Sequence, residues 1–208
     1  MKRSHKLAVL AVTAAVAITA GAVVAERTLT PAPPQFQAHD ITGVPWGHGF
    51  ELTDHNGRKR TLADFRGKVV MLFFGYTSCP DMCPTTLALL AGAMKELGPD
   101  AGRVQGLFVT VDPKRDTPKL LAQYVPAFYP TFLGLYADRE TTERTVREFK
   151  GYAHANPPDA NGSYTVDHSA QVYVFDAAGR LRLYVQPPEA TPESVAHDVR
   201  TLLAEAAQ

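Results

Sequence analysis

The sequence predicts a three-layer α/β fold, in which helices cover both faces of one mixed β-sheet. Two observations lead to this prediction. Apolar runs of strand length alternate with segments of helical periodicity, which is the pattern of strands joined by crossover helices. One hairpin precedes this alternation, and a second hairpin and a last helix follow it. The chain has 208 residues, of which 45% are hydrophobic and 20% charged, as expected for one globular domain with an additional segment.

Residues 1–25 are predicted to be a membrane anchor or a signal segment. An uncharged run from Leu7 to Ala25 follows the basic start Met-Lys-Arg-Ser-His-Lys. A helix over this run is roughly 28 Å long, close to the ~30 Å hydrocarbon thickness of a bilayer. The length of the run predicts one transmembrane helix. The basic residues before it predict that the N-terminus is in the cytoplasm and the domain outside it. The alternative is cleavage at the small residues near Ala25, which would release a soluble protein.

Residues 26–46 are predicted to be a proline-rich linker, and residues 47–208 to form the domain. Four prolines and few large apolar residues between Arg27 and Trp46 favour an extended chain. An alternating strand then begins at Phe50, and Asn56-Gly57 predicts a tight turn. The domain therefore opens with an N-terminal β-hairpin.

The central strand and the helix after it have the clearest patterns. The apolar run Lys68–Phe74 suits a strand buried on both faces of a sheet. Cys83–Leu97 carries leucines and a methionine at helical spacing, and Pro84 falls in the first turn, where a helix tolerates it. A helix therefore follows the central strand directly.

The remaining elements continue this alternation. Their order is that of the thioredoxin fold with additions, although other three-layer α/β arrangements share the same periodicity. We expect strands over Val104–Val111 and Thr131–Tyr136, a helix starting at Pro118 with Asp116 and Thr117 as caps, a helix over Thr141–Lys150, a hairpin of Gln171–Asp176 with Leu181–Val185, and a helix over Pro192–Ala207 capped by Thr191.

Charge argues against one class of partner. Lysine plus arginine total 21 and aspartate plus glutamate total 21, so the formal net charge is zero. No long-range field favours a polyanion. We therefore expect no nucleic-acid partner.

The two cysteines, Cys79 and Cys83, lie where the central strand ends and the helix begins. Ligands and reactive groups collect at this edge of a sheet. Backbone N–H groups and the helix dipole favour negative charge there, which predicts lowered pKa values for both thiols. The Cys-x3-Cys spacing puts both residues on one helical face, where they can bind a metal or form a disulfide. A disulfide across so short a loop would stabilise the chain weakly.

A histidine is expected to complete the site. Two thiolates suit Cu(I), and a neutral imidazole as third donor would also allow Cu(II). His168 is the candidate, because it stands in a loop just before the strand Gln171–Asp176, and in a thioredoxin-like sheet that loop faces the helix with the cysteines. The other histidines are interpreted as solvated residues of the N-terminal segment, linker, turns, loops and last helix: His5, His39, His48, His55, His154 and His197.

Three segments resemble, in order and separation, the signature regions of the Sco/SenC family of copper-binding proteins. They are FFGYTSCPDMCPTTL, VTVDPKRDTP and VDHSAQVYVFDAAG. The resemblance runs from about Phe50 to the end of the chain. It implies a bacterial member with an anchor in the inner membrane and its domain in the periplasm. Carried over position by position, the copper ligands of the family fall on Cys79, Cys83 and His168.

The resemblance also implies a function. The family role is that of a copper metallochaperone that assists assembly of the dinuclear copper centre in subunit II of cytochrome c oxidase, with other periplasmic copper chaperones or thiol reductants as further partners. The alternative is a thiol–disulfide oxidoreductase that reduces the cysteines of that target, in which Cys79 attacks and Cys83 resolves. The two roles are compatible, because Cu(I) binding requires the reduced pair. A peroxidase of peroxiredoxin type lacks a signature for peroxide activation.

Three residues beside the candidate ligands receive other interpretations. Met82 is expected to point away from the metal or to pack. Asp167 is a candidate for supporting His168, although neighbouring side chains on an extended segment diverge. Asp112, at the end of its strand, is a candidate for partner contact or for tuning the site.

Overall fold

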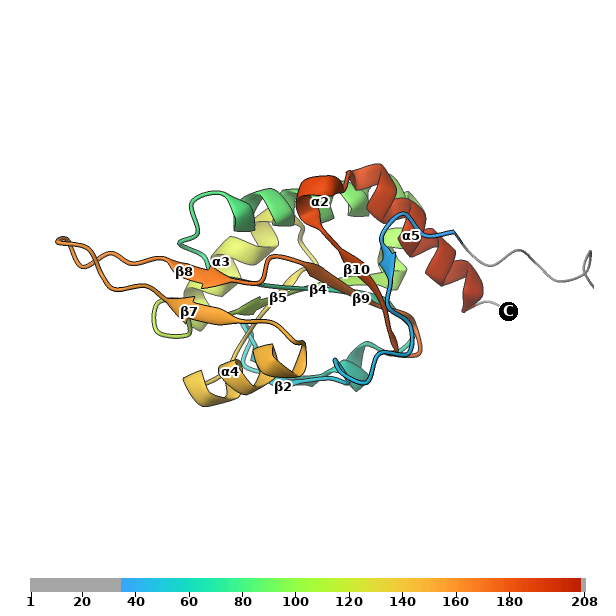
Figure 1. Ribbon diagram of the computed structural model, residues 1–208. Coiled ribbons are helices and arrows are strands. Elements are labelled where there is room, and N and C mark those ends of the chain that lie inside the picture. The colour runs from blue at the N-terminus through green and yellow to red at the C-terminus, as the bar shows by residue number, and fades with distance from the viewer. Residues whose placement is uncertain (1–34, 207–208) are drawn as a thin grey trace, which may run out of the picture. The chain divides into compact units, whose positions relative to one another are not determined.

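The computed structural model describes residues 35–206 of the chain, and its residues from Phe36 onward form one compact unit. An eight-stranded mixed sheet lies at the centre of this unit, with the strand order β1-β10-β9-β4-β5-β6-β2-β3. Helices lie on both faces of the sheet (Figure 1). The predicted three-layer α/β architecture is therefore confirmed.

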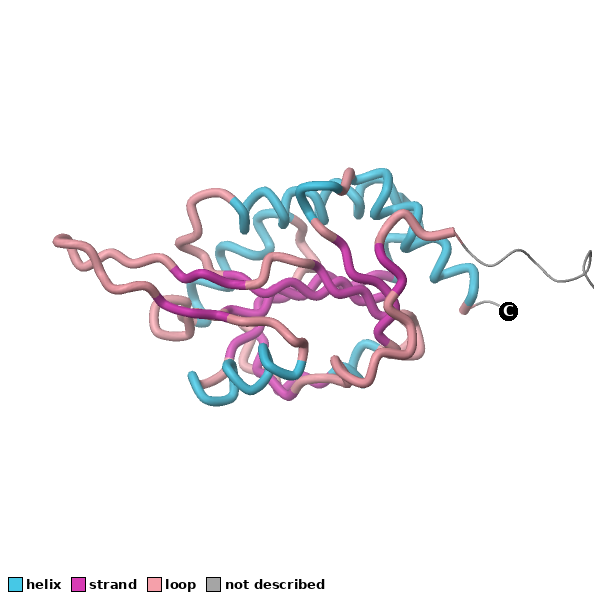
Figure 2. The backbone as a smooth tube through the Cα atoms, viewed as in Figure 1, coloured by secondary structure: helices cyan, strands magenta, loops and turns pink. Residues whose placement is uncertain are grey.

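Strands and helices alternate along the middle of the chain. Figure 2 shows the strands in the middle of the unit, with helices on both sides of them. The strands are β1 (His39–Asp40), β2 (Glu51–Asp54), β3 (Lys59–Thr61), β4 (Val69–Gly75), β5 (Val104–Thr110), β6 (Leu133–Tyr136), β7 (Ala153–Ala155), β8 (Val166–His168), β9 (Val172–Phe175) and β10 (Leu181–Val185). The helices are α2 (Met82–Leu97), α3 (Pro118–Phe128), α4 (Arg139–Glu148) and α5 (Pro192–Glu205), with short 3₁₀ turns η1 (Leu62–Phe65), η2 (Gly98–Arg103) and η3 (Pro187–Glu189).

The central strands β4 and β5 run parallel and are buried along their whole length. Alternate side chains of a strand point to opposite faces of its sheet. The odd-numbered residues of β4 from Val69 to Phe73 therefore enter the core beneath α2, α3 and α5. The even-numbered residues from Val70 to Phe74 enter the second core, which includes Val146 of α4. Burial on both faces explains the continuous apolar run of the sequence.

Both predicted hairpins form. Strands β2 and β3 pair antiparallel across the predicted Asn56-Gly57 turn, and Gly57 has a φ of 82°, which glycine adopts without a side-chain clash. Strands β9 and β10 also pair antiparallel. The predicted caps of α3 and α5 are present, because the hydroxyls of Thr117 and Thr191 accept hydrogen bonds from the N–H groups of Leu120 and Ser194.

The predicted linker is too long at its C-terminal end. Within its range, His39 and Asp40 form β1, an edge strand that pairs antiparallel with β10. Asp198 of α5 holds this segment, because its carboxylate accepts hydrogen bonds of 2.8 Å from the N–H groups of Gln37 and Ala38. The compact unit therefore begins before residue 47. The sequence does not reveal this, because backbone pairing and hydrogen bonds to Asp198 need no apolar periodicity in the segment.

A second difference concerns β7 and β8. These strands form a separate two-stranded antiparallel sheet, the β7–β8 hairpin (residues 153–168), in a stretch for which the sequence predicts loop. Each strand has three residues, which is too short for a recognisable alternation. The hairpin projects beyond the main sheet on the side of α3 and α4 (Figure 1).

The predicted membrane segment Leu7–Ala25 lies outside the described residues. Within residues 35–206, no helix has both the length and the apolar character needed to cross a bilayer.

Candidate metal centre

The two cysteines lie at the carboxyl end of β4, as the sequence predicts. Cys79 is in the turn that follows the strand and is half-buried, whereas Cys83 is the second residue of α2 and is fully buried. Both are free thiols. The N–H group of Cys83 points at the Cys79 Sγ atom, 3.5 Å away. Cys79 precedes the helix, so it is the turn that brings the two side chains together.

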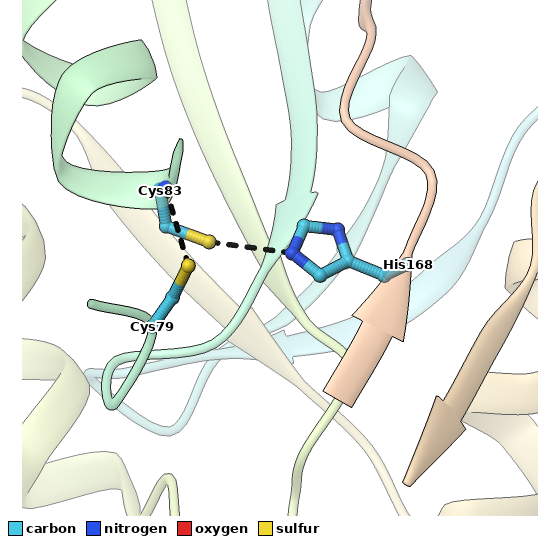
Figure 3. A group of neighbouring side chains, drawn as sticks. All are labelled: Cys79, Cys83 and His168. Atoms are coloured by element: carbon cyan, nitrogen blue, oxygen red, sulfur yellow. Dashed lines mark hydrogen bonds between the residues drawn. The ribbon is translucent and has the colours of Figure 1, made fainter. Parts of the chain in front are cut away.

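His168 approaches the cysteines from the β7–β8 hairpin, where it is the last residue of β8. Its Nε2 atom lies 3.4 Å from the Cys83 Sγ atom (Figure 3). Its other ring nitrogen, Nδ1, lies 2.9 Å from the carbonyl oxygen of Ser169. A carbonyl can only accept a hydrogen bond, so this contact assigns the proton to Nδ1 and leaves the Nε2 lone pair facing the sulfurs.

The three side chains converge on one point. Their donor atoms all lie within 4.8 Å of one another. Within residues 35–206, this is the one cluster of three or more histidine, cysteine or acidic side chains that could hold a metal ion. Metal–sulfur and metal–nitrogen bonds of ~2.0–2.3 Å place the donors of a three-coordinate site roughly 3.5–4 Å apart. The arrangement therefore fits a metal ion with little movement, and two sulfurs with one imidazole favour a soft ion.

Burial dominates the electrostatics of the site. It raises the pKa of the Cys83 thiol above its usual range, so the predicted lowering is wrong for this cysteine. The dipole of α2 does favour a thiolate, but the loss of hydration in a fully buried position outweighs it. Burial also lowers the pKa of His168, which keeps the imidazole neutral at neutral pH. A neutral imidazole is the form that binds metals.

Aromatic side chains enclose the His168 ring. The ring of Tyr76 meets it edge to face at a centroid distance of 5.8 Å, and the ring of Phe73 does so at 6.2 Å. Gly75, which lies between Phe73 and Tyr76 in the sequence, has no side chain and so leaves space for the Cys83 Sγ atom. A Cβ atom at Gly75 would come within 2.9 Å of the Cys83 Sγ atom and 2.7 Å of the Phe108 ring.

Asp116 has a role that the sequence analysis missed. It is 1% exposed, and its carboxylate accepts hydrogen bonds from the Thr77 N–H group at 3.0 Å and from the hydroxyls of Thr77 and Thr110 at 2.6 Å. It therefore fixes the loop that leads to Cys79 against the end of β5. Of the two residues predicted to cap α3, only Thr117 is confirmed as a cap. No short-range pattern reveals this contact, because Asp116 and Thr77 are 39 residues apart.

The other residues singled out from the sequence lie around this centre. Met82 is at the start of α2 with a 36% exposed side chain, and Asp167 is exposed on β8. Asp112 is buried and pairs with Arg115. The interpretation of His55 as a solvated turn residue is incomplete, because its Nδ1 atom accepts a hydrogen bond of 3.0 Å from the N–H group of Gly134.

The fold and this site together define a thioredoxin-like protein with a Cys-Cys-His centre suited to a soft metal, and comparison with known proteins agrees. The SCO1/SenC family model matches residues 39–204. A copper-bound structure of Bradyrhizobium japonicum ScoI is 37% identical with a TM-score of 0.70, covering 76% of this chain and 99% of that one. The apo Sco1 structure from Thermus thermophilus is 38% identical with a TM-score of 0.72, covering 83% and 99%.

Curated sequences show the same relationship. The mitochondrial SCO2 homolog of Bos taurus is 43% identical over 137 residues, which is 65% of this chain and 52% of that protein. The chain thus matches about half the length of the mitochondrial relatives. The match of the family model over most of the chain shows that it belongs to the SCO1/SenC family.

Proposed function

We propose that this protein is a copper metallochaperone that binds one Cu(I) or Cu(II) ion through Cys79, Cys83 and His168. The observation that carries the proposal is the convergence of these three donors from two separate elements of the fold. The copper-bound structure of a relative with 37% identity supports copper as the metal. Membership of the SCO1/SenC family supports assembly of the dinuclear copper centre of cytochrome c oxidase subunit II as the purpose of binding.

The different exposures of the two sulfurs suit a carrier. Cys83 is fully buried and shields one side of the ion from water, whereas Cys79 is half-buried and can be reached by a ligand from another protein. A client cysteine could therefore replace Cys79 first while Cys83 and His168 still hold the metal. Such stepwise exchange transfers copper without releasing it to solution.

A thiol–disulfide oxidoreductase is the second candidate function, and the accessibility of Cys79 favours it. The Cys79 thiolate would attack a disulfide of the client and form a mixed disulfide, and the Cys83 thiolate would then displace the client. The client leaves with two thiols, and this chain leaves with a Cys79–Cys83 disulfide that a thiol reductant must reduce. This chemistry makes no use of His168, so the alignment of His168 Nε2 with Cys83 favours the copper function.

Location follows from the proposed role and the N-terminal sequence. We propose that Leu7–Ala25 anchors the chain in the inner membrane with the domain in the periplasm. Cleavage at the small residues of this segment would instead give a soluble periplasmic protein. Mass spectrometry of the N-terminus in membrane and soluble fractions distinguishes these forms.

Anaerobic titration of the reduced chain with copper tests the function. We expect one copper per chain and, for Cu(II), a thiolate-to-metal charge-transfer band. His168→Ala should lose the band and bind Cu(II) weakly while its thiols still exchange with disulfides. Because Zn²⁺ accepts the same donors, a competing zinc titration checks the preference for copper. A wild-type chain that exchanges disulfides but fails to retain copper would leave the oxidoreductase function in its place.

A further inference from the structure

The metal donors belong to two elements that the main sheet does not connect directly. Cys79 and Cys83 follow β4, a central strand, whereas His168 is on the separate β7–β8 hairpin. A two-stranded hairpin is marginally stable by itself in water. Contacts with the rest of the domain must therefore decide where the imidazole lies.

We propose that Arg115 is a positioning residue that holds the β7–β8 hairpin, and with it His168, against the cysteine loop. Its guanidinium carbon lies 3.6 Å from the centroid of the Tyr164 ring, in the segment that leads into β8. The same group lies 5.4 Å from the Tyr76 ring, which precedes the cysteine loop. One guanidinium thus contacts an aromatic ring from each of the two elements that carry the donors. This inference rests on the proposed copper function.

Hydrogen bonds fix the guanidinium in this position. The Nη1 atom of Arg115 donates to the carbonyl oxygen of Tyr164 at 2.7 Å, and its Nε atom pairs with the carboxylate of Asp112. The same carboxylate accepts a hydrogen bond of 2.9 Å from the Tyr164 hydroxyl. The N–H group of Asp112 donates to Thr110 Oγ1 at 3.0 Å, which anchors the cluster to the end of β5. Asp112 is therefore the orienting partner of Arg115.

The effect reaches His168 through Tyr76. The ring of Tyr76 packs edge to face against the His168 imidazole at a centroid distance of 5.8 Å, and the Arg115 guanidinium lies over that same ring. Arg115 therefore holds the chain at Tyr164, four residues before the donor, while Tyr76 packs against the ring of the donor itself. The second anchor of the hairpin is at its base, where the Tyr152 N–H group donates to the Ser169 hydroxyl at 3.0 Å.

Lysine cannot reproduce these contacts. A guanidinium is planar, stacks on aromatic rings and donates in two directions at once, whereas an ammonium is a compact point charge. Arg115→Lys keeps the charge but loses the simultaneous contacts to Asp112, Tyr164 and Tyr76. Removal of groups that orient a metal ligand typically weakens metal binding roughly 10- to 100-fold.

Cu(II) binding of the full chain tests the proposal. Arg115→Lys should weaken Cu(II) binding roughly 10-fold or more and shift the paramagnetic spectrum, with Cu(I) affected less because two thiolates remain. Tyr164→Phe, which loses only the hydroxyl bond to Asp112, should have the same effect to a smaller degree. The matched control is Arg60→Lys, since Arg60 also pairs with a buried aspartate, Asp54 at 2.8 Å, and lies over a ring, Phe65 at 5.7 Å, but on the β2–β3 hairpin.

Two further measurements separate this role from general stability and from the function itself. In a His168→Ala background, Arg115→Lys should cause no further loss of Cu(II) binding, because the donor it positions is gone. Without metal, amide exchange in β8 should accelerate in Arg115→Lys while exchange in α2 does not. Unchanged Cu(II) binding in Arg115→Lys, or unchanged exchange in β8, would overturn the positioning role alone. A wild-type chain that retains no copper would overturn the proposed function, and the exchange experiment would still decide whether Arg115 holds the hairpin.

Discussion

The carboxylate of Asp116 accepts hydrogen bonds from both polar groups of Thr77: its N–H group, 3.0 Å from the nearer oxygen, and its hydroxyl at 2.6 Å. Thr77 is two residues before Cys79, so this pair fixes the loop that presents the outer sulfur. The carboxylate is buried, and burial raises its pKa despite these hydrogen bonds. Burying a carboxyl group costs free energy unless hydrogen bonds replace its lost hydration. The hydrogen bonds of Asp116 therefore have a structural role.

Asp116→Ala should destabilise the chain and weaken copper binding together. Removing the carboxylate leaves the donors of Thr77 and Thr110 without their acceptor, which costs roughly 1–3 kcal/mol in the free energy of unfolding. Urea unfolding and a copper titration measure the two effects. Asp138→Ala is the control, because Asp138 accepts the same two kinds of bond from Thr141 at the exposed start of α4. Equal copper affinity in Asp116→Ala and wild type would contradict the prediction.

Gly75→Ala should displace the sulfur of Cys83. The added methyl group would come within 3.0 Å of Cys83, Phe108 and Phe73, and overpacking of this kind costs about 1–3 kcal/mol. We expect lower stability and weaker Cu(I) binding, measured by thermal unfolding and by competition with a Cu(I) chelator. Gly102→Ala is the matched control, because its new methyl group would meet nothing within 4 Å. A Gly75→Ala chain as stable as Gly102→Ala would show that the strand end adapts easily.

Copper affinity should rise with pH above neutrality. Burial raises the pKa of the Cys83 thiol, so Cu(I) must displace a proton from it, and each proton released makes affinity rise about tenfold per pH unit. His168 adds no such proton above pH 6.5, because burial lowers its pKa. Competition titrations between pH 7 and 8 should show a slope that persists in His168→Ala and decreases in Cys83→Ser. A flat profile for the wild type would mean that Cys83 is already a thiolate.

His55 should make the stability of the domain fall in mild acid. Burial lowers its pKa below 6.5, so as the pH falls from 6.5 the unfolded chain takes up the proton before the folded chain does, and folding stability is lost in that window. Protonated Nδ1 can no longer accept the N–H group of Gly134. His55→Asn keeps an acceptor but does not titrate.

Chemical unfolding between pH 5 and 7 measures this effect. The decrease in stability should be smaller in His55→Asn than in wild type. His168, whose pKa is also lowered, is present in both proteins, so the difference between them isolates His55. Parallel curves for the two proteins would assign the pH dependence to other groups.

The main-sheet architecture was largely predictable from the sequence, because its signals are local. The run before Gly75 is apolar at every position because β4 is buried on both faces, and Thr117 and Thr191 cap helices through bonds to residues three positions away. Strand β1 and the β7–β8 hairpin were missed for the opposite reason. Each of these strands is only two or three residues long, and β1 also depends on a partner far along the chain, as in the pairing of His39 with Tyr184.

By itself, the sequence determined the chemistry available at the site: two cysteines at the start of a helix, and a histidine within a motif shared with a copper-binding family. Only the tertiary structure decided how these groups behave. Burial raises the pKa of Cys83, whereas the helix position alone predicts the reverse. The contacts of Asp116 with Thr77 and of Arg115 with Tyr164 join residues 39 and 49 positions apart. The hydration of a side chain and its long-range hydrogen bonds depend on which groups the folded chain brings together. Local sequence patterns therefore cannot predict them.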